Sequence, residues 1–237
     1  MTRTPAQPPA HHIREHFSLL ADSERRALIW IAGRLPARIN SDHLSTLALV
    51  SMLAAGVSFA SFRVTPWAAL GVIVSLIANW FGDSLDGTVA RVRGQQRPRY
   101  GFYVDHVIDL AGTAMLLAGL ACSGLMNPTL AVTLLAAYLL VSAESYLATH
   151  AAGIFRLSFL GFGPTELRIV LAMGALKVVS SPWIALGGLL EVRLFDLGGI
   201  VAIAGLALAF IVSAVRNTMT LYAAEPRPAP TDESRAA

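Results

Sequence analysis

The stretch Asn79–Leu110 reads NWFGDSLDGTVARVRGQQRPRYGFYVDHVIDL and places four aspartates beside two strongly apolar segments. Asp83 and Asp86 are three residues apart. Asp105 and Asp109 are four apart, and both spacings place a pair of carboxylates on one face of a helix. Two such helices facing each other near a membrane would need a cation between them to offset the repulsion. Oxygen ligands without a nearby Cys favour a hard divalent ion, Mg²⁺ or Mn²⁺, and four of them favour two ions.

The same stretch carries a longer pattern of fixed spacings. Asp83-x-x-Asp86-Gly87-x-x-Ala90-Arg91 is followed, after nine residues, by Gly101-x-x-x-Asp105-x-x-x-Asp109. This pattern resembles the signature of the CDP-alcohol phosphotransferases, or CDP-alcohol phosphatidyltransferases. These integral membrane enzymes make phospholipids by moving a substituted phosphate from a CDP-linked donor to an alcohol, with release of CMP. The interval is one residue longer than is usual in the family, and Gly94 and Pro98 within it predict a loop.

The resemblance implies a role for each residue of the pattern. The implied metal ligands are Asp83, Asp86, Asp105 and Asp109, and Asp109 is also a candidate base for the attacking hydroxyl. The implied nucleotide-binding residues are Gly87, Ala90, Arg91 and Gly101. Gly87 and Ala90 lack bulk, so a nucleotide could lie against the backbone, and the Arg91 guanidinium suits phosphate oxygens. Asn79 lies one helical turn before Asp83 and is expected on the same face.

Two further features resemble the choline/ethanolamine phosphotransferase branch of the family. His106 directly follows Asp105, and Thr165-Glu166 opens a later apolar segment. The resemblance implies that His106 and Glu166 form a proton-accepting pair, a role that suits imidazole at neutral pH. The alternatives are a histidine that packs between helices and a glutamate favoured in the first turn by the helix dipole.

Composition defines the class of protein. Of the 237 residues, 55% are hydrophobic and 14% are charged, and the mean hydropathy is +0.60. These values are typical of an all-α polytopic membrane protein. The single Cys122 excludes a disulfide within the chain, and no stripe of alternating basic and aromatic residues predicts nucleic-acid binding.

The pattern of polar and apolar residues predicts four regions. Residues 1–10 are Pro-rich and are expected to be disordered. Residues 11–39 have apolar positions at helical spacing with Arg and Glu between them, which predicts an amphipathic helix in the membrane interface. Residues 40–222 are expected to form a six-helix transmembrane catalytic domain, and residues 223–237 a disordered tail.

The six spans are drawn from the apolar runs. They are His43–Phe62, a second from Pro66 through the first half of the motif, Gly101–Gly124, Pro128–Ala152, Pro164–Leu186 and Phe195–Thr218. Ser41 or Asp42 is the expected N-cap of the first span, and Pro182 interrupts the fifth. Glu144 and His150 are further candidates because they are ionisable groups in or near a span.

Basic residues predict the orientation of these spans. With both termini in the cytoplasm, eleven arginines lie on the cytoplasmic side: Arg25, Arg26, Arg34, Arg38, Arg91, Arg93, Arg97, Arg99, Arg156, Arg168 and Arg216. Arg63 and Arg193 lie outside, and this asymmetry is what the positive-inside rule requires. The aspartate site is then at the cytoplasmic end of the second and third spans, where nucleotides are present.

These observations favour a metal-dependent phosphotransferase of phospholipid synthesis that uses two divalent cations. The expected partners are a CDP-linked donor, a lipid or polar alcohol acceptor and membrane lipids, and the resemblance adds a homodimer. Either a small headgroup is donated to a diacylglycerol-like lipid, or CDP-diacylglycerol donates a phosphatidyl group to a small polar alcohol. Other classes are a cation or proton transporter that uses intramembrane carboxylates and an inactive scaffold.

Overall fold

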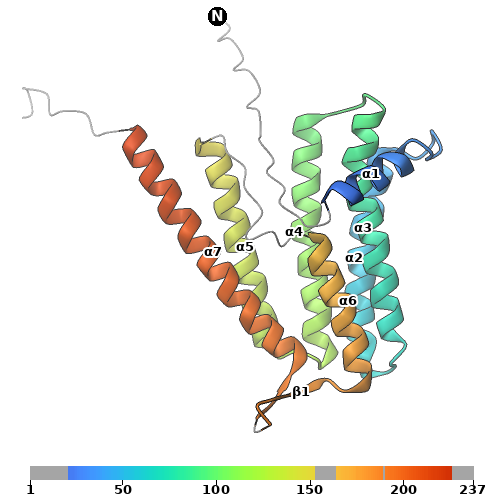
Figure 1. The fold of residues 1–237 in the computed structure, drawn as a ribbon, viewed down its shortest axis with the longest axis vertical. Coiled ribbons are helices and arrows are strands. Elements are labelled where there is room, and N and C mark those ends of the chain that lie inside the picture. The colour runs from blue at the N-terminus through green and yellow to red at the C-terminus, as the bar shows by residue number, and fades with distance from the viewer. Residues whose placement is uncertain (1–20, 153–163, 189, 226–237) are drawn as a thin grey trace, which may run out of the picture.

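The apolar runs of the sequence fold into long helices. The computed structural model describes residues 21–152, 164–188 and 190–225. The helices are α1 (Ala21–Ala32), α2 (Ser41–Ala60), the short 3-10 helix η1 (Ser61–Arg63), α3 (Ala68–Val92), α4 (Pro98–Ser123), α5 (Pro128–Ala152), α6 (Pro164–Ser180) and α7 (Leu194–Ala224). Figure 1 shows α2 to α4 side by side, α6 beside them, and α5 paired with α7.

Five of the described helical segments are long and apolar enough to cross a membrane: Ser41–Arg63, Ala68–Val92, Pro98–Ser123, Pro128–Ala151 and Leu194–Ala224. Many of their large apolar side chains are exposed at helical spacing, such as Leu70, Val74 and Ile77 on α3. Such a surface suits lipid rather than water. The multiple apolar helices therefore indicate an integral membrane protein, as the composition predicts.

The expected fifth span, Pro164–Leu186, is shorter than predicted. α6 ends at Ser180, and Trp183–Leu186 and Leu190–Arg193 instead form an antiparallel hairpin, β1 and β2. Pro182 explains the end of the helix, because proline lacks an amide hydrogen and clashes with the preceding turn. Gly187 and Gly188 have positive φ angles of 61° and 74°, which suit the hairpin turn. The fold is mostly helical rather than purely α.

Other boundaries differ by a few residues. The N-cap of α2 is Asn40 rather than Ser41 or Asp42, because the Asn40 side chain accepts a hydrogen bond from the His43 amide. α7 runs on to Ala224, past the expected domain limit at residue 222. α1 lies within the expected interfacial helix of residues 11–39. The predictions for residues 1–10, for 11–20 and for most of the tail lie outside the described residues.

Small residues let α2, α3 and α4 approach closely. A Cβ added at Gly82 of α3 would lie 2.6 Å from the Leu44 carbonyl oxygen of α2. A Cβ at Gly119 of α4 would overlap the carbonyl oxygen of Gly56 on α2. Glycine and other small residues are typical of such contacts between membrane helices. The backbones of α3 and α4 are therefore both held against α2.

Two apolar clusters occupy different parts of this bundle. One joins α2 to α7 through buried side chains that include Phe59, Val72 and Phe195. The other joins α1 to α2 and α3 through Leu28, Ala32, Leu44, Leu85 and Val89. On α3, Asn79 and Asp83 lie between Leu76 of the first cluster and Leu85 of the second. The bundle thus leaves a polar band between two apolar layers.

Replacing Gly119 by alanine is expected to destabilise the fold. The added Cβ forces α2 and α4 apart, and such overpacking costs about 1–3 kcal/mol. Thermal unfolding of the purified protein should show a lower midpoint. Gly205 of α7 is the matched control, because a Cβ there meets no atom within 4 Å. Equal midpoints for Gly119→Ala and Gly205→Ala would contradict the close contact of α2 with α4.

Candidate metal centre

Aspartates of α3 and α4 approach each other because both helices pack against α2, α3 antiparallel to it and α4 parallel to it. α3 ends at Val92 and α4 begins at Pro98, so the motif interval is a short connection as predicted. Gly94 ends the helix with a φ of 65°, and the Gln95 amide donates to the Ala90 carbonyl oxygen at 2.9 Å. The last turns of α3 therefore lie beside the first turns of α4.

Three carboxylates converge at this junction. One oxygen from each of Asp83, Asp105 and Asp109 can be chosen so that all three lie within 4.8 Å of one another. Oxygens bound to one Mg²⁺ lie at most about 4.2 Å apart, as its short bonds require. Small side-chain rotations would therefore suffice to coordinate an ion. The donor set is all oxygen and negatively charged, so it fits a hard divalent cation.

Asp86 is the expected ligand that lies outside this group of three. Its Oδ2 accepts a hydrogen bond of 2.6 Å from the Ser45 hydroxyl of α2, and its Oδ1 accepts one from the Gly87 amide. The Ser41 hydroxyl also donates to the Asp86 carbonyl oxygen at 2.9 Å. In this arrangement Asp86 ties α3 to α2. Its role as a metal ligand stays a prediction.

Arg168 binds the site from α6. Its Nη2 donates to Asp83 Oδ2 at 2.6 Å, and its Nε donates to Asn79 Oδ1 at 2.8 Å. The buried Asn79 donates in turn to the Ala48 carbonyl oxygen of α2 at 3.0 Å. Asn79 was expected on the face of Asp83, and the shared arginine confirms that placement. The contacts of Arg168 could not be read from the sequence, although a cation within an apolar segment calls for a partner.

The predicted nucleotide-binding residues lie around the end of α3 and the start of α4. Gly87 is half-buried, and a Cβ there would lie 3.3 Å from an Arg91 guanidinium nitrogen. Arg91 is exposed, and its Nη2 donates to the Thr88 hydroxyl at 3.0 Å. Ala90 is half-buried, whereas Gly101 is exposed with no atom within 4 Å of an added Cβ. Nucleotide binding by these four residues stays a prediction.

His106 is buried against α5, and Glu166 lies in the first turn of α6. The His106 Nδ1 lies 2.7 Å from the Phe102 carbonyl oxygen, and its ring stacks on Phe102 and meets Tyr146 edge-on. A carbonyl oxygen can only accept, so we assign the proton to Nδ1 and the acceptor lone pair to Nε2. The pairing of His106 with Glu166 stays a prediction.

Other polar groups connect the helices away from the three converging carboxylates. Glu144 of α5 accepts hydrogen bonds of 2.7 Å from both Ser213 and Asn217 of α7. These bonds give this intramembrane candidate a role in joining two helices. Tyr138, also on α5, lies near Asp109. The sequence did not single out Tyr138, because one tyrosine in an apolar run carries no signal.

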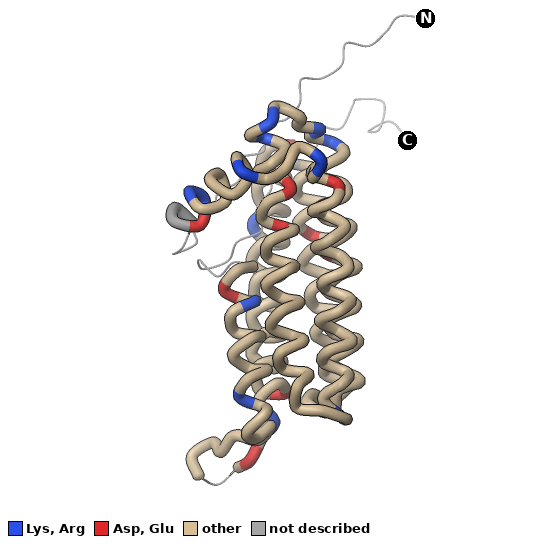
Figure 2. The backbone as a smooth tube through the Cα atoms, turned by 90° about the vertical axis from the view of Figure 1, so that its right-hand side faces the viewer, with Lys and Arg blue, Asp and Glu red and all other residues tan. Residues whose placement is uncertain are grey.

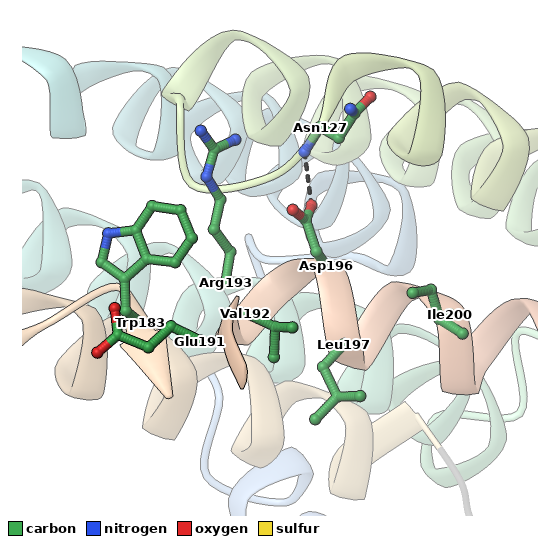
Figure 3. Close-up of a pocket in the computed structure, with 8 residues that line it drawn as sticks. All are labelled: Asn127, Trp183, Glu191, Val192, Arg193, Asp196, Leu197 and Ile200. Carbon is green, nitrogen blue, oxygen red and sulfur yellow. Dashed lines mark hydrogen bonds between the residues drawn. The ribbon is translucent and has the colours of Figure 1, made fainter. Parts of the chain in front are cut away.

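A pocket of about 430 Å³ lies at the opposite end of the bundle. It is formed by the turn before α5, the hairpin and the start of α7, with Trp183, Arg193 and Asp196 in its wall (Figure 3). Asp196 accepts a hydrogen bond of 2.6 Å from the Asn127 amide. The acidic residues of this pocket, Asp196 and Glu191, lie far from the three converging carboxylates. The pocket is therefore not the predicted metal site.

Charge is distributed unevenly along the helices. Figure 2 shows Lys and Arg gathered at the end where α1 lies, with fewer at the hairpin end. Arg97 forms an ion pair with Asp42, and Arg93 donates to the carbonyl oxygens of Leu35, Pro36 and Ile39. Arg93 thus fastens the linker before α2 to the end of α3, and Arg97 joins the start of α4 to the first turn of α2.

The comparison with family models agrees with this geometry. A family model described as CDP-alcohol phosphatidyltransferase matches residues 41–215. The chain therefore belongs to the CDP-alcohol phosphatidyltransferase family. A comparison with curated proteins finds no match.

Substitution of Asp105 by asparagine is expected to weaken Mn²⁺ binding by at least about tenfold, because it removes a negatively charged ligand. Titration of the purified protein, followed by the electron paramagnetic resonance signal of free Mn²⁺, measures this affinity. Glu191→Gln, which changes an exposed carboxylate in β2, is the matched control. Asp86→Asn should behave like Asp105→Asn. An unchanged Mn²⁺ affinity in Asp86→Asn would show that Asp86 contacts α2 but does not bind the ion.

Proposed function

We propose that the protein transfers a substituted phosphate from a CDP-linked donor to a hydroxyl acceptor and releases CMP. The observation that carries this proposal is the convergence of Asp83, Asp105 and Asp109 from two helices of a family member. The family also favours a transferase over a transporter or a scaffold. The acceptor oxygen forms a bond to the phosphorus that carries the substituent. The bond from this phosphorus to the CMP oxygen breaks, and the hydroxyl proton passes to a base.

We propose two divalent cations, Mg²⁺ or Mn²⁺, as cofactors. Asp83, Asp105 and Asp109 would hold them, with Asp86 as a fourth ligand if its side chain leaves Ser45. Bound ions would supply charge neutralisation for the diphosphate during an in-line displacement. Gly87, Ala90, Arg91 and Gly101 would place the nucleotide beside the carboxylates, and the Arg91 guanidinium can donate to phosphate oxygens.

For the base we propose His106, with Glu166 as its partner. The Phe102 carbonyl oxygen fixes the imidazole proton on Nδ1, which leaves Nε2 able to accept a proton. Asp109 is the alternative base, since it is exposed and belongs to the three carboxylates. The resemblance at His106 and Thr165-Glu166 supports our proposal that the chain acts like the choline/ethanolamine phosphotransferase branch, in which a small headgroup is donated to a diacylglycerol-like lipid. The competing scheme is CDP-diacylglycerol donating to a small polar alcohol.

We propose six spans, in which α6 is the fifth along the chain, with the active site on the cytoplasmic side. The 17 residues of α6 extend about 25 Å, near the shortest length that spans a bilayer. In Figure 1, α5 ends near the level of the end of α7, and α6 leads back to the hairpin from which α7 starts. The arginines near α1 favour a cytoplasmic location for the end of the bundle where α1 lies. The exposed faces of α5 and α7 leave room for a homodimer.

A donor-by-acceptor screen of the purified protein tests the reaction. With Mg²⁺ or Mn²⁺, we expect CMP release only when a CDP-linked donor and a hydroxyl acceptor are both present, with the lipid product identified by mass. CDP-choline or CDP-ethanolamine with diacylglycerol represents the first scheme, and CDP-diacylglycerol with polyols or amino alcohols the second. Lack of CMP release from every donor would refute the enzyme function.

The choice of base can be tested by two amide substitutions. We expect His106→Asn to lower kcat by about a hundredfold or more, because proton transfer to a positioned base contributes that much, while Mn²⁺ affinity stays unchanged. Asp109→Asn should lower both kcat and Mn²⁺ affinity. Normal turnover in His106→Asn would instead assign proton transfer to Asp109.

Labelling of introduced cysteines tests whether α6 crosses the membrane. In a variant with Cys122 replaced by alanine, Ala185→Cys in the hairpin should react with an impermeant maleimide added outside intact cells. Gln95→Cys in the connection between α3 and α4 should react only after the membrane is opened, because α6 crosses between the two sides. Labelling of both positions from one side would leave the chain with five spans.

A further inference from the structure

The first turn of α6 is fastened to the bundle from two directions. Arg168 reaches Asp83 and Asn79 of α3, as described above. On the other side, the Thr165 hydroxyl donates to Glu24 Oε1 of α1 at 3.1 Å. Both contacts come from one helical turn. The position of this turn therefore decides where the Arg168 guanidinium lies relative to the carboxylates.

Glu24 also binds α3. The indole Nε1 of Trp80 donates to Glu24 Oε1 at 2.6 Å, so one carboxylate oxygen accepts from both α3 and α6. Trp80 is next to Asn79 in the sequence, and Asn79 is a partner of Arg168. The contacts thus form a closed network that joins three helices. Glu24 of α1 accepts from Trp80 of α3 and from Thr165 of α6. One helical turn of α6 then connects Thr165 to Arg168, which donates to Asn79 beside Trp80.

α1 packs against α3, so it can hold Glu24 in place within this network. Leu28 and Ala32 of α1 are buried against Leu85 and Val89 of α3. Glu24 lies one turn before Leu28, so it is on the same face and is only partly exposed. By contrast, Arg25 and Arg26 point away from the bundle and are exposed. Glu24 also lies outside the residues that the family model matches, 41–215.

We infer that Glu24 is a positioning residue for the active site, acting through Thr165 to keep Arg168 on Asp83. This inference rests on the proposed function. The physical reason is that a small displacement of a positioning group can cost orders of magnitude in rate. The inner face of α1 at Glu24 therefore has a positioning role beside its packing on α3.

Three substitutions isolate this role. Glu24→Ala removes the acceptor and should lower kcat by about tenfold or more with little change in donor KM. Glu24→Gln keeps an oxygen at Oε1 that can accept from both Trp80 and Thr165, so it should restore most of the activity. Thr165→Val has nearly the same shape without the hydroxyl, and it should reproduce most of the Glu24→Ala loss. Arg26→Gln is the control on the exposed face of α1.

Amide hydrogen exchange provides a readout that needs no turnover. In Glu24→Ala, the amides of residues 168–172 should exchange several-fold faster, because the first turns of α6 open more often. Glu24→Gln and Arg26→Gln should exchange like the wild type. Unchanged exchange and kcat in Glu24→Ala would overturn the inference. Lack of CMP release by the wild-type protein would count against the proposed function alone.

A double-mutant cycle then tests whether Glu24 acts through Arg168. We expect Arg168→Gln to lower kcat, and Glu24→Ala to cause no further loss in the Arg168→Gln background. Such non-additivity is the signature of residues that share one network. Fully additive losses would show that Glu24 acts by another route and would overturn the proposed coupling.

Discussion

Mutual repulsion of carboxylates is the constraint that the rest of the structure must satisfy. Asp83, Asp105 and Asp109 come from two helices and lie within a few ångströms of one another. Bringing like charges this close together is unfavourable unless the backbone is held and the charge is offset. The backbone is held because Gly82 and Gly119 let α3 and α4 contact α2 directly. Part of the charge is offset by the Arg168 guanidinium on Asp83.

The architecture separates this polar band from apolar surroundings on both sides. One apolar cluster packs α2 to α7 near the hairpin end, and the other packs α1 onto α2 and α3. Low dielectric on either side strengthens each polar contact between them. Asp86 with Ser45, Asn79 with Ala48, and Arg168 with Asp83 all cross between helices in this band. The residues that fix the site are thus also the residues that fix helix register.

α1 connects an outer surface of aromatic and basic side chains to this band. Its outer face exposes Ile29 and Trp30, and Arg34 lies over the Trp30 ring at 3.9 Å. Aromatic and basic side chains of this kind favour the interface of a bilayer. Its inner face carries Leu28 and Glu24 toward α3. The helix with this outer face therefore touches the same turn of α6 that carries Arg168.

The sequence by itself determined the membrane class, most helix positions and the convergence of three of the four aspartates, because these follow from local periodicity and from spacing within one motif. It also fixed the connection at residues 93–97 through Gly94 and Pro98. The tertiary structure alone decided what long-range contacts control: that Asp86 turns to Ser45, that Arg168 binds Asp83, and that Glu24 holds Thr165. The partners in these contacts lie 41, 85 and 141 residues apart, so no local pattern encodes them. Pro182 in the sequence predicts an interruption of α6. The hairpin of β1 and β2 that follows the helix is seen only in the tertiary structure.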